Sequence, residues 1–201
     1  MRPCACNFRI FSMNDFFLLN NESLPYEFID QNIEIKQIQV KNLNRFGQFA
    51  VPIKKVESYS VETITPIINT DMIQIMGVLS LATTLDAKYF TDILKNTSAI
   101  AELILKVIEV NEDLFKKEEL SKRPVLQETE SASWFNSIQY LVTAGHRPDD
   151  ILNMSYGAFL KYIEAAQRNE RQNIKNTAIA VRMAMNSSKE EWDKSIKQLE
   201  K

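Results

Sequence analysis

The residue types best suited to catalysis lie around the single histidine of the chain, His146. An imidazole close to two carboxylates, Asp149 and Asp150, could act as a general base with acidic neighbours. However, His146 follows Gly145 where a helix is expected to end, and the aspartates follow Pro148 where another is expected to begin. Interaction with the helix dipole therefore explains the aspartates without catalysis, and neighbouring helical residues point about 100° apart. We expect no acid–base site here.

Other patterns that bind cofactors or metals are absent from the sequence. The chain has no glycine-rich phosphate loop ending in Gly-Lys-Ser or Gly-Lys-Thr, no dinucleotide-binding glycine pattern and no His-Glu-x-x-His sequence. Its two cysteines, Cys4 and Cys6, are one residue apart, too close to staple a fold and without partners for a zinc site. We therefore predict a protein that is not an enzyme and that uses no cofactor and no metal.

A pattern of positive charge indicates binding rather than catalysis. Lys161, Arg168, Lys175 and Arg182 are spaced seven residues apart. On a continuous helix they form one stripe, because seven residues are nearly two turns. A solvated face is the ordinary explanation, and contact with an acidic partner helix or another anion is the alternative. The sequence leaves open whether the helix continues through residues 167–173.

Apolar helices supply the other candidate partner-binding residues. The segment of residues 71–81 is apolar on nearly all sides and contains Met72 and Met76, whose thioethers adapt to irregular surfaces. The segment of residues 98–110 also carries apolar side chains on several sides, among them Ile100 and Ile104. Core packing is the ordinary explanation, but a partner could cover part of either helix.

The clearest prediction of local structure concerns residues 133–172. Apolar residues at helical spacing end at Gly145, where a positive φ is expected. A short helix then begins at Pro148, and Ser155 can cap a longer helix. Near the C-terminus, either of two overlapping capping boxes can begin a last helix, Ser187 with Glu190 or Ser188 with Glu191.

The N-terminal part combines a small β element with helices. Hydrophobicity alternates in residues 28–40 around a turn-like Asp30-Gln31-Asn32, which favours a hairpin or two short strands. A helix from Leu43 is expected to end at Pro52, and residues 56–66 have no decisive pattern.

Three helices are predicted to form the core of this part. Asn69 or Thr70 can cap the first, a shorter one is expected after Asp86, and the third follows Asn96.

Composition predicts where the chain divides. Residues 116–131 are charged, contain Pro124 and lack apolar periodicity, as expected of a linker. We predict a mainly α fold of two small helical lobes, the N-terminal one with a short β-hairpin or two short strands. The predicted parts are an irregular tail (1–12), an N-terminal lobe (13–115), the linker (116–131) and a C-terminal helical lobe (132–201). Translation could begin at Met1 or at Met13.

Composition also argues against two classes of partner. The chain carries 24 basic and 26 acidic residues, a net charge of −2, without the positive excess of a general nucleic-acid binder. No apolar run approaches the roughly 20 residues that cross a bilayer. Arg9, Ser12 and Asp15 interrupt the stretch that would have to form a secretory signal. We therefore expect a cytoplasmic protein with no nucleic-acid or membrane partner.

One passage is similar to a known family. Residues 140–169, YLVTAGHRPDDILNMSYGAFLKYIEAAQRN, resemble the C-terminal part of the tail assembly chaperones of long-tailed bacteriophages, where a helix, a short turn and a long helix recur. Residues 33–49, IEIKQIQVKNLNRFGQF, and the helical run from Thr70 to Leu114 are similar to the N-terminal part of that family.

This resemblance implies a non-enzymatic chaperone in the host cytoplasm that coats the helical tape-measure protein and helps recruit tail-tube subunits. The sequence leaves open whether it acts as a homo-oligomer. The alternative is a structural virion or adaptor protein whose helices form a permanent assembly. The residues expected to contact protein partners are Met72, Met76, Ile100, Ile104, Lys161, Arg168, Lys175 and Arg182.

Overall fold

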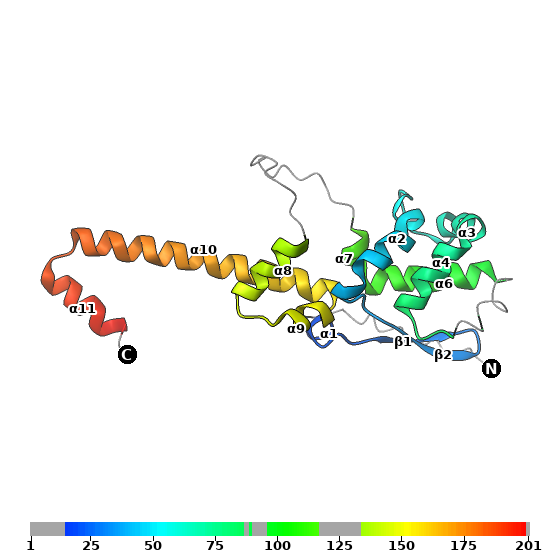
Figure 1. The fold of residues 1–201 in the computed structure, drawn as a ribbon, viewed down its shortest axis with the longest axis horizontal. Helices are drawn as coiled ribbons and strands as arrows, with labels where there is room; N and C mark the ends of the chain where they lie inside the picture. The colour runs from blue at the N-terminus through cyan, green and yellow to red at the C-terminus, as the bar shows by residue number, and fades with distance from the viewer. Residues whose placement is uncertain (1–14, 87–88, 90–95, 117–133, 200–201) are drawn as a thin grey trace, which may run out of the picture. The chain divides into compact units, whose positions relative to one another are not determined.

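The computed structural model describes residues 15–86, 89, 96–116 and 134–199. The chain divides into two compact units, unit 1 (residues 1–160) and unit 2 (residues 161–201). The described part is mainly helical with one two-stranded antiparallel sheet (Figure 1). The predicted fold class is therefore confirmed. Most of the helix expected after Asp86, the tail with both cysteines and nearly all of the predicted linker lie outside the described residues.

The elements follow one another along the chain as labelled in Figure 1. Those that lie wholly in unit 1 are α1 (Asp15–Leu19), β1 (Leu24–Phe28), β2 (Gln31–Ile35), the 3₁₀-helix η1 (Val40–Asn42), α2 (Leu43–Lys54), α3 (Val61–Thr70), α4 (Met72–Ala82), α6 (Thr97–Val110), α7 (Glu112–Phe115), α8 (Trp134–Thr143) and α9 (Pro148–Asn153). Helix α10 (Tyr156–Asn186) begins in unit 1 and continues in unit 2, which also holds α11 (Lys189–Leu199).

The hairpin is amphipathic and packs on helix α6. Strand β1 pairs with β2 so that Leu24 faces Ile35 and Phe28 faces Gln31. Ile33 and Ile35 are buried while their neighbours Asn32 and Glu34 are exposed, as the alternation predicted. A lone two-stranded ribbon is marginal in water, so the contact of both strands with α6 supplies the burial that stabilises it.

Helix α6 is the centre of the core. Ile100, Ala101, Leu103, Ile104 and Val107 are all buried on it, although they lie on several of its sides. Helix α3 packs along one side and the hairpin on another. The all-round apolar pattern of α6 is therefore explained by its central position within unit 1.

Two prolines lie inside helices where the sequence predicted a stop or no pattern. Helix α2 does not end at Pro52 but runs to Lys54, and α3 contains Pro66. Proline removes one N–H donor and crowds the preceding turn. In the last turn of α2 the burial of Ile53, which is fully inaccessible, outweighs that cost. The residues expected to cap α4, Asn69 and Thr70, belong instead to the end of α3.

A strand-like segment after β2, residues 36–40, joins distant parts of unit 1. The Lys36 N–H donates to the Ala82 carbonyl at 2.7 Å, and the Ile38 N–H donates to Asn111 Oδ1 at 2.7 Å. The Tyr156 N–H donates to the Ile38 carbonyl at 2.9 Å. The segment thus holds the start of α10 against the helical core.

Because of this connection, the boundary between the two units lies after Leu160 and not at the predicted linker. The C-terminal lobe was expected to begin at residue 132, but residues 134–160 belong to unit 1. The Val40 N–H donates to the Met154 carbonyl at 3.0 Å, and Lys41 Nζ donates to Asn153 Oδ1 at 2.7 Å. The charged composition of residues 116–131 predicted a linker. It could not predict that residues 134–160, which follow it, pack in the same unit as the residues before it.

Several local predictions are confirmed. Gly145 has φ of +100° at the end of α8, and the Ala158 N–H donates to the Ser155 hydroxyl at the start of α10. The structure also answers a question that the sequence left open, because helix α10 is continuous through residues 167–173. Of the two capping boxes, Ser188 with Glu191 forms, with the Ser188 N–H donating to the carboxylate at 2.9 Å.

The amide of Asn111 should be essential to the stability of unit 1. Replacing it with alanine removes the acceptor of the buried Ile38 N–H and the donor to the Lys36 carbonyl. We expect Asn111→Ala to lower the free energy of unfolding by about 1–3 kcal/mol, the cost of unsatisfied buried polar groups. Urea denaturation measures this change. Asn69→Ala, at an exposed position of α3, is the control and should change it little; equal effects would contradict the assignment.

Candidate protein-binding surfaces

The structure separates the apolar candidates of the sequence into buried and half-buried residues. Ile100 and Ile104 have exposed fractions of 2% and 0% and lie inside the core. Their prediction as partner contacts is wrong for this folded state, because the hairpin and α3 already cover α6. Met72 and Met76 are half-buried and pack against the same core, so only part of each thioether side chain faces outward.

An apolar groove in unit 1 offers a surface that the sequence did not indicate. It has a volume of about 580 Å³ and lies between η1 with α2 on one side and α8 on the other. We call it the α2–α8 groove. Its lining residues are Val40, Lys41, Leu43, Asn44, Gly47, Gln48, Val51, Trp134 and Ile138.

Helical spacing aligns the walls of the groove. Leu43, Gly47 and Val51 follow one another at intervals of four on α2, and Trp134 and Ile138 do the same on α8. Residues four apart lie on one face of a helix, so each helix presents an apolar row. Because Gly47 has no side chain and nothing lies within 4 Å of a Cβ built there, it leaves open space in the floor.

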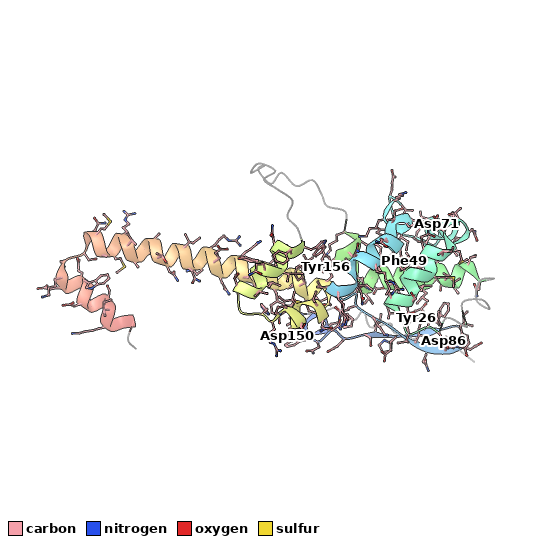
Figure 2. The ribbon with its side chains drawn as sticks, in the orientation of Figure 1. Tyr26, Phe49, Asp71, Asp86, Asp150 and Tyr156 are labelled. Atoms are coloured by element: carbon pink, nitrogen blue, oxygen red, sulfur yellow. The ribbon has the colours of Figure 1, made fainter. Side chains whose placement is uncertain are left out.

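Trp134 is held at the rim of the groove by aromatic contacts. Its ring centroid lies 6.1 Å from that of Tyr156, which Figure 2 labels, and 5.9 Å from that of Phe159. Phe159 is buried, whereas Trp134 retains an exposed fraction of 53%. A tryptophan that is held in place by other aromatic rings and is still half exposed is typical of the residues that dominate protein interfaces.

The chemistry of the groove suits binding and not proton transfer. The described residues of its lining combine apolar side chains with one lysine and two amides, and include no histidine, cysteine or carboxylate. The apolar walls match the apolar face of an amphipathic helix, and Asn44 and Gln48 can hydrogen-bond to polar groups of that helix at the edges of the groove. His146 and the pair Asp149 and Asp150 are not among the groove residues.

The four predicted cations lie on α10 in unit 2. Lys161, Arg168, Lys175 and Arg182 are all exposed, and the continuous helix places them in one row as predicted. Every residue of α10 from 167 to 186 is exposed. Within unit 2 this half of the helix therefore has a large free surface.

Helix α11 covers only part of that surface. The residues of α10 that share a hollow of about 620 Å³ with Glu191 and Ser195 of α11 are Ile179, Arg182, Met183 and Asn186. Trp192 of α11 has an exposed fraction of 38%. The apolar residues of α10 outside this hollow stay uncovered in unit 2.

Metal sites and membrane spans are two further classes to consider for the described residues. No group of three or more His, Cys, Asp or Glu side chains there could hold a metal ion. No single helix of the described ranges is long and apolar enough to cross a membrane; only α3 and α4 taken together, bent by 113°, reach that length and composition. Helix α3 buries Ile64 and Ile68 in the core of unit 1, and helix α4 buries Ile75 and Val78 there.

Comparisons of the chain with family models, with curated proteins and with solved structures found no match. The resemblance of residues 140–169 to tail assembly chaperones therefore stays a hypothesis that rests on those residues. The surfaces described above are the independent observations that bear on what the protein binds.

Gly47 and Gly77 form a matched pair that tests the packing of α2. A Cβ at Gly47 would meet nothing, whereas one at Gly77 of α4 would meet the ring of Phe49, which Figure 2 labels. We expect Gly47→Ala to raise the free energy of unfolding by about 0.5–1 kcal/mol, since alanine favours the helix. Gly77→Ala should lower it by about 1–3 kcal/mol through overpacking. Thermal or urea unfolding of both variants decides this; equal shifts would contradict it.

The capping box of α11 should respond to acid. The backbone N–H of Ser188 and then its hydroxyl hydrogen-bond the Glu191 carboxylate and lower the pKa of that group. A carboxyl whose folded pKa is depressed stabilises the fold above its unfolded pKa, about 4.3, and this contribution is lost as the pH falls through the folded pKa. NMR shifts of residues 189–195 should therefore lose helical character below about pH 4. Glu191→Gln should remove this dependence, whereas Glu190→Gln should keep it; the reverse order would contradict the assignment.

Proposed function

We propose that the protein is a non-enzymatic tail assembly chaperone, acting in the host cytoplasm, that binds an amphipathic segment of a tape-measure protein and helps bring tail-tube subunits to it. The observation that carries this proposal is the α2–α8 groove with Trp134 half-open at its rim. The resemblance of residues 140–169 supports the choice of family, because this passage includes Ile151, Ser155 and Phe159, which pack α9 and α10 into unit 1.

The physical task of such a chaperone is to cover an apolar stripe. A tape-measure protein is a long amphipathic helix whose apolar face would aggregate before the tail tube encloses it. An apolar groove receives such a helix through side chains three or four residues apart. The spacing of Leu43, Gly47 and Val51 matches that periodicity, so the groove can accept one or two turns.

The proposal assigns different contacts to different surfaces. The tape-measure helix is assigned to the α2–α8 groove in place of the buried Ile100 and Ile104. Lys161, Arg168, Lys175 and Arg182 are assigned to a second protein partner, in keeping with their exposure on α10. Two surfaces on one chain can bring two partners together at a high effective concentration.

A structural virion or adaptor protein is the second candidate function. The observation that favours it is the uncovered length of α10 from residue 167 to residue 186, which a permanent helical assembly could bury. The two functions differ in stoichiometry. A chaperone should be absent from finished particles, whereas a structural subunit should remain in them.

Filling the groove should abolish chaperone activity without unfolding the protein. Gly47→Leu adds a side chain to the open floor, where a Cβ meets nothing. We expect this variant to bind a tape-measure segment at least about tenfold more weakly, a loss of ~1.4 kcal/mol or more. Co-expression should then leave the segment insoluble. Circular dichroism should show that the variant keeps its helical content.

The control removes an exposed apolar side chain outside the groove. Ile73→Ser changes a residue of α4 with an exposed fraction of 77% and should leave binding unchanged. Unchanged binding by Gly47→Leu, or loss of binding in both variants, would count against the groove. Recovery of the wild-type protein from mature particles in stoichiometric amounts would replace the chaperone by the structural subunit.

A further inference from the structure

An apolar row runs along the exposed half of α10. Ile174, Ala178, Val181 and Met185 succeed one another at steps of four, three and four residues. This is the spacing of the a and d positions of a coiled coil, which form one seam. The exposed fractions of Ile174, Val181 and Met185 are 63%, 53% and 79%, so the described residues of unit 2 leave the seam exposed.

The cation row borders this seam with Lys175 and Arg182, and Lys161 and Arg168 continue the row toward the start of α10. In the same heptad register Lys161, Arg168, Lys175 and Arg182 all occupy position e, directly after the d positions held by Ile174 and Val181. Residues at e flank the seam and face the charges of a partner helix. Helix α11 leaves the apolar seam open, because the apolar residues of α10 that line its hollow are Ile179 and Met183, at positions b and f. Arg182, at the end of the cation row, also lines that hollow.

Charge decides which helix fits the seam. In an antiparallel pair with a second copy, position e would face position e, and four cations would oppose four cations. In a parallel pair, position e would face position g, which is occupied by Ile163, Glu170, Thr177 and Ala184. Only one of these four residues is acidic. A second copy therefore complements the cation row poorly in either direction.

The size of the seam points to reversible binding. Two heptads of Ile, Ala, Val and Met bury less than the roughly 800 Å² per partner of a standard stable interface. Ion pairs along the cation row have to contribute, and such pairs weaken as salt screens them. The seam is therefore suited to a regulated or transient contact.

We propose that residues 174–185 of α10 are a docking surface for an amphipathic helix whose apolar seam is bordered by a row of Asp or Glu residues. This inference rests on the proposed function in one respect, since it gives the chemistry of the second partner. It uses a different surface from the α2–α8 groove, so that the two can be tested separately.

Two designed peptides test the proposal with the full-length protein. Both carry leucine at a and d over three heptads and are identical except for the bordering e and g positions, which are all glutamate in one and all lysine in the other. The glutamate peptide should bind at least tenfold more tightly at low salt, and the difference should shrink as salt is raised. Fluorescence anisotropy of labelled peptides measures both affinities.

Matched variants locate the contact. Ile174→Asp/Val181→Asp places two negative charges in the seam and should weaken binding of the glutamate peptide at least tenfold. Asn169→Asp/Asn176→Asp adds the same charge on exposed positions of α10 outside the seam and should have a much smaller effect. Gly47→Leu should leave peptide binding unchanged, which separates this result from a failure of the groove.

Three outcomes would overturn the proposal. The two peptides could bind equally well, or the seam variant could retain full affinity. Alternatively, sedimentation velocity could show that the protein associates with itself and that Ile174→Asp/Val181→Asp abolishes this, which would assign the seam to a second copy.

Discussion

The hydrogen bonds of residues 36–40 are the constraint on which the rest of unit 1 depends. Among the described residues no strand lies beside this segment, and its backbone groups hydrogen-bond with Ala82, with the side chain of Asn111 and with residues 154–156. Buried backbone groups without partners are costly, which makes these contacts obligatory. They hold the start of α10 against the core, and α8 is thereby brought opposite α2. The groove follows from this connection.

The sequence predicted what local chemistry determines. Gly145 has the positive φ expected of a helix end, Ser155 caps α10, and Ser188 forms a box with Glu191. The predictions that needed tertiary structure were wrong or missing. Apolar periodicity marked Ile100 and Ile104 as buried or partner-covered without deciding between them, and the helix predicted before Gly145 did not single out Trp134. The bond between Ile38 and Asn111 spans 73 residues, a distance over which no periodicity operates.

The proposed function assigns two surfaces of different chemistry to two partners. The α2–α8 groove is almost uncharged and offers Trp134 as an anchor, so its affinity would come from apolar burial. The seam of α10 is bordered by Lys161, Arg168, Lys175 and Arg182, so its affinity would depend on salt. A protein of this kind can hold an apolar helix firmly while it exchanges an acidic one.

Hydrogen–deuterium exchange of the full-length protein, with and without a tape-measure segment, tests the central claim most directly. The account predicts slower exchange on binding at the two sides of the groove, which are η1 with α2 (residues 40–54) and α8 (residues 134–143). Exchange in the core helix α6 should be the same with and without the segment. Unchanged exchange at both sides of the groove, with protection elsewhere in unit 1, would contradict the account.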